Sequence, residues 1–370
     1  MDFSFTEEQV MLRDGVKRFL EKNCDFEARK ALLRSGAPWS AQAWKALGEM
    51  GVLSLPFPEE AGGMGGSAVD LVPVAEVCGE HIAVEPWPFT QVLAGGLLVR
   101  AGAGGRVAQV AAGGLVAACA WDEGRGLAAP AQVAMPATAD GDALVLNGGK
   151  RLVIAGAEAG LLVAAVRHAG APGEKAGLAL VAVDPAAPGV SITPFRTQCG
   201  RSAAHVRFDG VRVEAAGVLS RDAHDLLAAA FADTILVLAA ETVGAMGALL
   251  RVTAAYANTR RQFGAPIGTF QAVAHRLADM KVAHAKAYAT LLYVTALMES
   301  GLATARDVSV LKAQVSRWGR FVGEAAVQTH GGVGMTDELC VGHYLKRILA
   351  FEAMFGAPDY HFRVIGQAAA

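Results

Sequence analysis

The spacing of apolar side chains changes twice along the chain. From Thr6 to about Gly113, apolar residues recur at helical spacing, which predicts a series of α-helices. Thr6 followed by Gln9 matches a capping box, so a helix is expected to begin there. Pro and Gly predict a loop at residues 56–63, and glycines at 102–105 are expected to loosen the chain. We therefore predict an N-terminal α-helical domain over residues 1–113.

Short apolar runs separated by turn residues replace the helical pattern over residues 114–219. The runs lie at residues 144–146, 161–163, 178–181, 206–208 and 211–213. Turns are expected at Asp140–Asp142, Asn147–Gly149 and Asp209–Gly210. This pattern predicts a middle domain that is an antiparallel β barrel or sandwich. Long apolar-periodic segments then return over residues 220–370 and predict a C-terminal four-helix bundle, giving an α+β multidomain fold.

Composition and charge exclude several classes of protein. The chain has 370 residues and 53% hydrophobic composition, enough for a large core. Lys and Arg number 33 against 35 Asp and Glu, so nothing favours a nucleic-acid partner. The most apolar stretch, residues 226–240, is too short to span a bilayer, and the N-terminus lacks the order of a signal peptide. The five cysteines are scattered, which predicts reduced thiols in a cytoplasmic protein. The absence of a metal-binding motif predicts that there is no metal site.

Two segments in the last third carry groups suited to a dinucleotide. Residues 260–264 read Arg-Arg-Gln-Phe-Gly, and residues 328–332 read Gln-Thr-His-Gly-Gly. Arg260 can bind a pyrophosphate with two parallel hydrogen bonds, and Gln262 can donate to it. Gly331 and Gly332 allow the backbone to approach a phosphate or sugar closely. The alternative is a solvated arginine pair and an ordinary glycine turn.

Together with residues 58–66, 147–150 and 277–280, these segments resemble the acyl-CoA dehydrogenase family along essentially the whole chain. The nearest likeness is to small subunits of heteromeric members, such as pimeloyl-CoA dehydrogenase and those acting on steroid side chains. The resemblance implies a flavoprotein oxidoreductase of fatty-acid or steroid side-chain degradation that forms the 2,3-enoyl thioester of an acyl-CoA. It also implies FAD as cofactor and an electron-transfer flavoprotein as acceptor. The cofactor-binding residues that it implies are Arg260, Gln262, Phe263, Ile267, Phe270, Gln328, Thr329, Gly331 and Gly332.

The sequence departs from the family where the flavin ring and the catalytic base are expected. Alignment places the ring-contacting positions at residues 122–124, 127–129, 152 and 154, and none of them carries a hydroxyl group or a tryptophan. A shift of one or two residues in this Gly/Ala-rich stretch is the alternative. The two family positions for the catalytic carboxylate fall on Phe355 and Thr234, neither of which can accept a proton as a base.

Glu241 is the remaining candidate for a base, because it lies within an apolar helix where desolvation would raise its pKa. The favoured interpretation is a structural glutamate; Asp122 and Asp233 are weaker candidates. The leading hypothesis is a subunit of a heterotetrameric acyl-CoA dehydrogenase that lacks the catalytic glutamate and shares FAD with a sibling subunit. The alternatives are a self-sufficient homotetramer with Glu241 as the relocated base, and a flavin-free scaffold or binding protein.

Overall fold

The computed structural model describes residues 5–124, 126 and 128–368. The chain divides by its contacts into two compact units. A helical unit comprises Met1–Lys30, Ala68–Ala83 and Ile235–Ala370, and a β unit comprises Ala31–Ser67 and Val84–Thr234. Helices, then sheets, then helices follow one another along the chain, which confirms the predicted fold class.

The N-terminal helices are α1 (Glu7–Asn23), α2 (Phe26–Ser35), α3 (Ala41–Glu49), α4 (Ala68–Glu80), α5 (Gly96–Arg100) and α6 (Gly104–Ala111). The predicted capping box begins α1: Gln9 N donates to Thr6 Oγ1 at 3.3 Å, and Thr6 N donates to Gln9 Oε1 at 2.9 Å. A buried π-helix, Pro88–Gly95, precedes α5. The prediction of a loosened chain at residues 102–105 is wrong in its second half, because α6 begins at Gly104.

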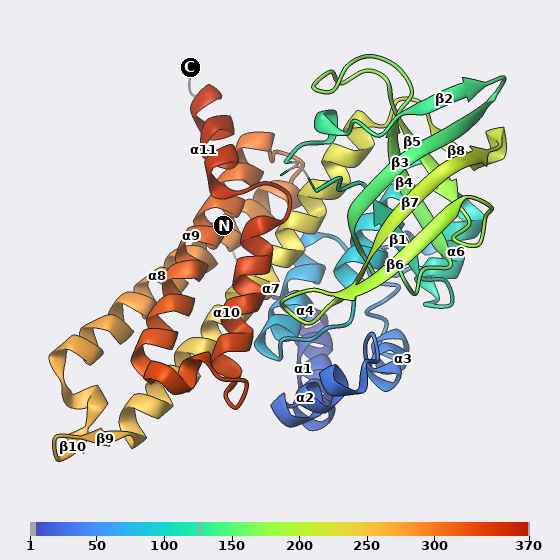
Figure 1. Ribbon diagram of the computed structural model, residues 1–370. Helices are drawn as coiled ribbons and strands as arrows, with labels where there is room; N and C mark the ends of the chain where they lie inside the picture. Colours follow the sequence, from blue (N-terminus) through green and yellow to red (C-terminus); the bar gives the residue numbers. More distant parts are fainter. Residues whose placement is uncertain (1–4, 125, 127, 369–370) are drawn as a thin grey trace. The chain divides into compact units, whose positions relative to one another are not determined.

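The C-terminal helices are α7 (His224–Thr259), α8 (Gln271–Glu299), α9 (Ala305–His330), α10 (Cys340–Ala353) and α11 (Pro358–Gln367). Helices α8, α9 and α10 pack side by side (Figure 1). By length and composition α7 could cross a membrane, and it is longer than the apolar stretch seen in the sequence. However, 72% of its most apolar window is buried inside the structure, which is typical of a core helix.

Two glycines let α4 and α7 approach each other at backbone distance. A Cβ atom built on Gly79 would lie 1.8 Å from the carbonyl oxygen of Glu241. Reciprocally, a Cβ atom on Gly244 would lie 2.0 Å from the carbonyl oxygen of Glu76. Neither position can accept a side chain without moving one of the helices. This contact fixes the part of α7 that carries Glu241.

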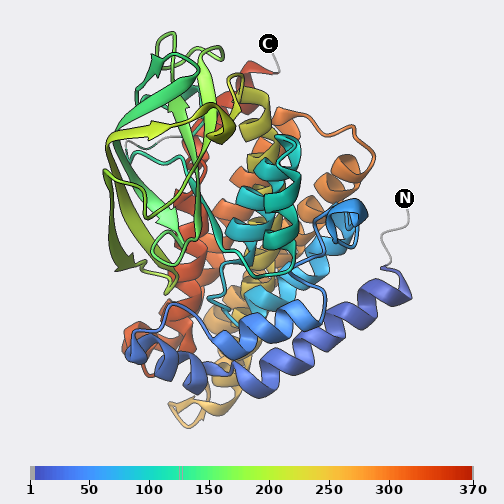
Figure 2. The same ribbon diagram turned by 90° about the vertical axis from the view of Figure 1, so that its right-hand side faces the viewer.

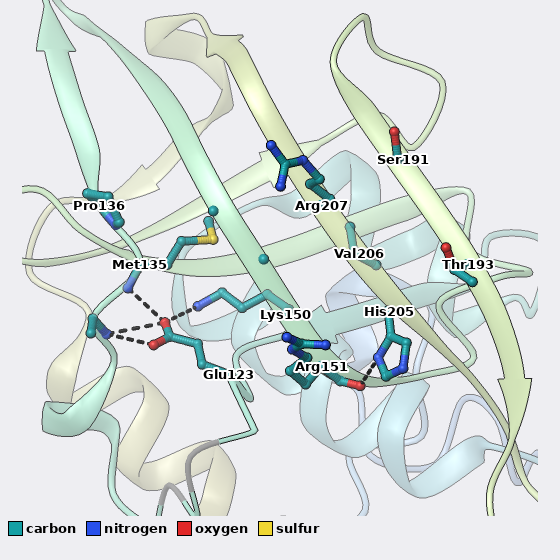
Figure 3. Close-up of a pocket in the computed structure, with 13 residues that line it drawn as sticks. Glu123, Met135, Pro136, Lys150, Arg151, Ser191, Thr193, His205, Val206 and Arg207 are labelled. Carbon is teal, nitrogen blue, oxygen red and sulfur yellow. Dashed lines mark hydrogen bonds and ion pairs between the residues drawn. The ribbon is translucent and has the colours of Figure 1, made fainter.

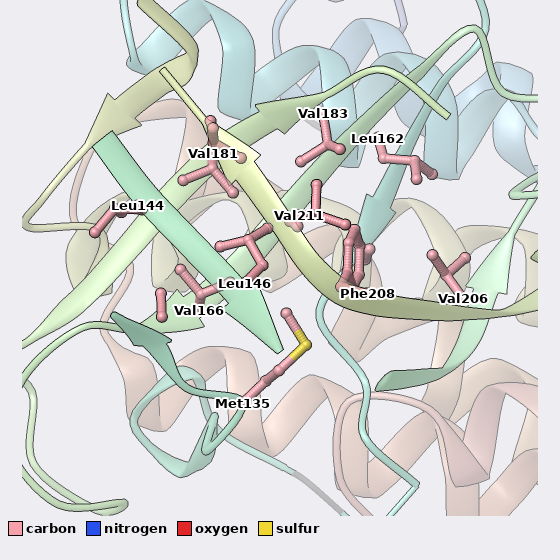
Figure 4. Close-up of a cluster of buried hydrophobic side chains, with 14 of the residues drawn as sticks. Met135, Leu144, Leu146, Leu162, Val166, Val181, Val183, Val206, Phe208 and Val211 are labelled. Carbon is pink, nitrogen blue, oxygen red and sulfur yellow. The ribbon is translucent and has the colours of Figure 1, made fainter. Parts of the chain in front are cut away.

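The β unit contains two four-stranded sheets. One has the order β1 (Ala117–Ala120), β4 (Leu161–Arg167), β5 (Leu178–Val183), β8 (Val218–Ser220). The other has the order β2 (Ala137–Asp140), β3 (Ala143–Ile154), β7 (Ser202–Val213), β6 (Val190–Arg196). The pair β1–β4 is parallel, so the expectation of a wholly antiparallel domain is wrong at that point. The sheets appear as two layers in Figure 2, and their inward side chains, among them Leu146, Val181 and Phe208, form one core (Figure 4).

Two of the three predicted turns are irregularities inside long strands. The turn at Gly141–Asp142 joins β2 to β3 as predicted, with φ +61° at Gly141. Asn147–Gly149 instead lies within β3, and Asp209–Gly210 lies opposite it within β7. The register shifts between Leu146 and Gly148, where Gly210 N donates to Asn147 Oδ1 at 2.8 Å. A β-bulge uses the same Gly and Asn residues as a turn, so composition alone could not separate the two.

Candidate functional site

The Arg260 segment forms an exposed hairpin between α7 and α8. Strands β9 (Arg261–Gln262) and β10 (Ala265–Pro266) pair around Phe263 and Gly264. Phe263 is 94% exposed and has φ +50°, and its only ring contact among the described residues is an edge-on one with Phe270, at 6.2 Å between centroids. The guanidinium of Arg260 is exposed and makes no hydrogen bond or ion pair within the described chain. An exposed cation beside an exposed aromatic ring is available to a ligand or to another chain.

The glycine segment follows the end of α9. Gln328 and Gly332 are exposed, and Gly331 has φ +67°, a left-handed conformation suited to glycine. A Cβ atom on either glycine would meet nothing within 4 Å. Thr329 is less available, because its hydroxyl donates to Ala325 O at 2.7 Å.

A stacked pair of rings joins the two segments at one end of the helical unit. Tyr256, one turn before Arg260 on α7, stacks on His330 with ring centroids 4.3 Å apart. His330 is buried and its Nδ1 donates to Ala326 O at 2.9 Å, which favours a structural role. Groups that are far apart in the sequence, and that could bind the adenosine and pyrophosphate arm of one dinucleotide, therefore lie on the same part of the helical unit.

The positions that align with the family's contacts to the flavin ring lie close together, but their side chains carry no hydroxyl group that could bond to the ring. Asp122 and Leu152 are direct partners in an isolated antiparallel bridge, and Ile154 is buried further along β3. Burial raises the pKa of Asp122, while the Gly124 N–H, which donates to its Oδ1 at 2.6 Å, opposes that shift. The amide of Ala128 is already bonded to Gln132 Oε1 at 2.7 Å, and Leu127 lies outside the described residues. No side-chain hydroxyl stands at any described aligned position.

A buried ion pair lies beside these positions. Lys150 Nζ is 2.8 Å from Glu123 Oε1, and both side chains are almost fully buried. Two backbone amides also donate to Glu123, from Met135 at 2.8 Å and from Ala134 at 3.1 Å (Figure 3). Glu123 is thus an acceptor for three donors and holds the loop after β1 against β3. Such a carboxylate is a structural group rather than a base.

The aligned position of the catalytic carboxylate, Phe355, lies in a tightly held turn. Phe355 is buried and has φ +55°, and its carbonyl oxygen accepts a hydrogen bond from His361 Nε2 at 2.9 Å. Burial lowers the pKa of His361 to about 4, so His361 is neutral and its Nδ1 accepts from the Ser309 hydroxyl at 3.1 Å. Lys312 Nζ donates to Gly356 O at 3.1 Å from the other side. These contacts hold the turn in place around an apolar side chain.

Glu241 forms a buried ion pair with an arginine of α10. Its Oε2 lies 3.5 Å from Nη1 of Arg347, and both side chains are 2% exposed. Arg347 also donates to Ala83 O at 2.7 Å, so the pair ties α7 and α10 to the end of α4. The other weak candidate, Asp233, bonds to Arg100 at 2.5 Å. This geometry favours the structural interpretation of Glu241.

Sequence reasoning missed Arg347, Lys312 and His361. Lys312 and Arg347 contact partners more than 40 positions away in the sequence. His361 contacts Phe355 across a turn whose shape the sequence does not specify. The only available signal was a charged residue at an apolar helical position, which Lys312 and Arg347 both provide. Among the described residues there is no cluster of His, Cys, Asp and Glu that could hold a metal ion.

Comparison with known proteins matches the whole architecture. Residues 6–104, 118–211 and 225–370 match the N-terminal, middle and C-terminal domains of acyl-CoA dehydrogenases. FadE27 of Mycobacterium tuberculosis is 29% identical over 99% of this chain and 98% of its own length. YngJ of Bacillus subtilis, a probable acyl-CoA dehydrogenase, is 28% identical over 99% of both chains. The ChsE4–ChsE5 complex of Mycobacterium tuberculosis contains a chain that superposes with a TM-score of 0.90 at 27% identity, covering 99% of this chain and 98% of that one. This chain therefore belongs to the acyl-CoA dehydrogenase family, whose members are FAD-dependent oxidoreductases acting on CH–CH groups.

Proposed function

We propose that this chain is the subunit of a heteromeric acyl-CoA dehydrogenase that lacks the catalytic carboxylate and completes the FAD site of a sibling subunit. One observation carries the proposal. Arg260 and Gln328, which are suited to the dinucleotide arm, are exposed and their side chains make no hydrogen bond or ion pair within the described residues, whereas the positions aligned with the ring and the base hold Asp122, Leu152, Ile154 and Phe355. A chain of this kind needs the ring site and the base from elsewhere.

The arm of FAD fits the exposed segments. Arg260 would bind the pyrophosphate, because a guanidinium forms paired hydrogen bonds to phosphate oxygens. Gln262 would donate to the same group, and Phe263, Ile267 and Phe270 would pack along the dinucleotide. In a similar way, Gln328, Thr329, Gly331 and Gly332 would border the adenosine, where the glycines leave open space.

The flavin ring does not fit the β unit of this chain. A ring edge placed against Leu152 and Ile154 would meet no hydroxyl donor, and each lost partner costs about 1–3 kcal/mol. Asp122 adds a carboxylate of raised pKa that already accepts from the Gly124 amide. The ring, which supplies the hydride-accepting chemistry of the family, is therefore assigned to the sibling.

The relatives support a two-component assembly. One similar structure is the ChsE4–ChsE5 complex, and another is the Tcur3481–Tcur3483 steroid enzyme, at 26% identity and a TM-score of 0.86. We propose a heterotetramer in the cytoplasm, an acyl-CoA substrate and an electron-transfer flavoprotein as acceptor. Glu241 is assigned to the fold through its pair with Arg347 and not to proton transfer.

Flavin stoichiometry tests the proposal. The chain is purified alone and after co-expression with a neighbouring dehydrogenase-like gene product, and bound FAD is measured by absorbance. We expect little flavin on the chain alone and about one flavin per two chains in the complex. Arg260→Ala should lower the flavin content of the complex, whereas Arg306→Ala, which removes the same charge near the start of α9, should not.

Two results would replace the proposal with an alternative. Full flavin loading of the chain alone, with activity that Glu241→Gln abolishes, would establish the self-sufficient homotetramer. Absence of flavin with every co-encoded partner would establish a flavin-free scaffold.

A further inference from the structure

A groove of about 580 Å³ opens on the β unit along strands β3, β7 and β6. Arg151, His205, Arg207, Ser191 and Thr193 stand around it, and the Glu123–Lys150 pair lies at its inner end (Figure 3). Small-molecule sites have volumes of about 300–1,000 Å³, so the groove can hold a ligand of nucleotide size. None of the positions assigned to the FAD arm lines this groove.

Positive charge dominates the lining. The buried Lys150 pairs with Glu123, so the guanidiniums of Arg151 and Arg207 leave the lining with a net positive charge. Glu123 is already neutralised by Lys150 and by two backbone amides. The guanidinium of Arg151 has no hydrogen bond or ion pair in the part of the chain that the structure describes. The groove therefore attracts an anion.

A neighbouring carboxylate, Asp209, does not cancel this charge. Asp209 lies 3.7 Å from Arg207, and both side chains are more than 70% exposed. An exposed pair of this kind contributes at most about 1 kcal/mol, so Arg207 can exchange Asp209 for a ligand.

Strand pairing places the polar groups side by side on three neighbouring strands, β3, β7 and β6. Arg207 is the direct partner of Ser191 on β6 and of Gly149 on β3, and His205 is the partner of Thr193. His205 Nδ1 lies 2.6 Å from Arg151 O, and since a carbonyl only accepts, Nδ1 is the donor. Diagonal positions on neighbouring strands lie about 7–8 Å apart, with their Cβ atoms somewhat closer, so the long side chains of Arg151 and Arg207 can reach one ligand.

Gly149 keeps the groove open between the two arginines. A Cβ atom there would meet only Val206 O, at an ordinary contact distance of 3.5 Å. The absent side chain is therefore not required by packing, in contrast to Gly148, where a Cβ atom would lie 2.6 Å from Met135.

We propose that this groove binds a small ligand through a diphosphate group held by Arg151 and Arg207. A guanidinium binds phosphate oxygens with paired, charge-assisted hydrogen bonds, and two guanidiniums suit two adjacent phosphates. The Ser191 and Thr193 hydroxyl groups supply further donors along the same face. The remaining volume accommodates a nucleoside attached to the diphosphate.

Calorimetric titration of the full chain tests the proposal with orthophosphate, pyrophosphate and ADP as probes. The chain carries Arg260→Ala throughout, so that the segments assigned to FAD cannot account for the binding. We expect saturable binding of pyrophosphate at one site per chain, tighter than that of orthophosphate and weakened by added KCl. Tighter binding of ADP than of pyrophosphate would assign a nucleotide, and equal binding would assign the diphosphate alone.

Single substitutions locate the site. Arg151→Ala and Arg207→Ala should each weaken pyrophosphate binding about tenfold or more, since each removes charge-assisted hydrogen bonds. Gly149→Leu fills the groove without removing a charge and should abolish binding. Arg212→Ala removes the same charge from β7 but outside the groove, where Arg212 pairs with Glu214, and should leave binding unchanged.

Two outcomes would overturn the proposal. One is the absence of saturable pyrophosphate binding by the folded chain, with folding verified by an unchanged thermal transition. The other is binding that survives both Arg151→Ala and Arg207→Ala, which would place the anion elsewhere. If Gly149→Leu fails to fold, the two arginine variants and the Arg212 control decide the matter.

Discussion

Replacing Arg347 by methionine tests whether Glu241 is a structural residue. The substitution keeps much of the side-chain volume but leaves the Glu241 carboxylate buried without its guanidinium partner. It also removes the donor 2.7 Å from Ala83 O. Breaking a buried ion pair by removing one partner costs about 3–5 kcal/mol, because the remaining charge stays desolvated.

Urea denaturation of the full chain, followed by circular dichroism of its helices, measures this cost. With an m-value of about 3 kcal/mol/M, the midpoint should fall by about 1–1.7 M. Lys346→Met is the matched control: Lys346 is the neighbouring residue on α10 and forms an exposed pair with Asp337, so its loss should cost less than about 1 kcal/mol.

A second substitution separates pairing from packing. Adding Glu241→Gln to Arg347→Met removes the uncompensated charge, so the double variant should be more stable than Arg347→Met alone. In the holo complex with its sibling, Glu241→Gln should leave kcat unchanged. The reasoning fails if Arg347→Met costs no more than the control, or if the two substitutions destabilise the chain additively.

Four further predictions follow from buried and exposed groups. Burial raises the pKa of Glu76 from 4.5 to about 8, so the folded chain binds one more proton than the unfolded chain between these pH values. The free energy of unfolding should therefore fall by up to about 1.4 kcal/mol for each pH unit across that range. Glu76→Gln should remove this pH dependence from the urea midpoints. Burial lowers the pKa of Lys312 from 10.5 to about 7, so between these pH values the unfolded chain binds one more proton than the folded chain. The free energy of unfolding should therefore rise with pH over this range, and Lys312→Met should remove the rise. Gly244→Ala should destabilise the helical unit by about 1–3 kcal/mol or more in thermal unfolding, whereas Gly366→Ala, which meets nothing within 4 Å, should stabilise it slightly. Phe263→Ser should leave stability within about 0.5 kcal/mol because the ring is 94% exposed, yet weaken assembly with the sibling in sedimentation velocity.

Much of the fold could be predicted because the spacing of apolar residues along the sequence indicates where helices and strands lie. The start of α1 at Thr6 and the turn at Gly141 each depend on contacts within a few residues, and both were found. The bulge at which Asn147 and Gly210 face each other was missed because it uses turn residues inside a continuous ladder. The predicted boundaries of the three domains, at residues 1–113, 114–219 and 220–370, stay a prediction.

The candidate site was predictable only where its chemistry is local. The Arg260 and Gln328 segments carry their own donors and glycines, so a cofactor role could be predicted from short stretches of sequence, and it stays a prediction. The partner of Glu241 lies 106 positions away, and no periodicity identifies which distant arginine a buried glutamate meets. The groove on β3, β7 and β6 was missed for the same reason, because its cations become neighbours only after the strands pair.

The turn at Phe355 is held by its neighbours rather than by its own side chain. A non-glycine residue at φ +55° costs roughly 1–2 kcal/mol, and His361 and Lys312 hold the carbonyl groups of this turn in place. These hydrogen bonds end on backbone oxygens, so they do not depend on which side chain stands at position 355. The same backbone turn can therefore carry a different side chain at this position without losing these contacts.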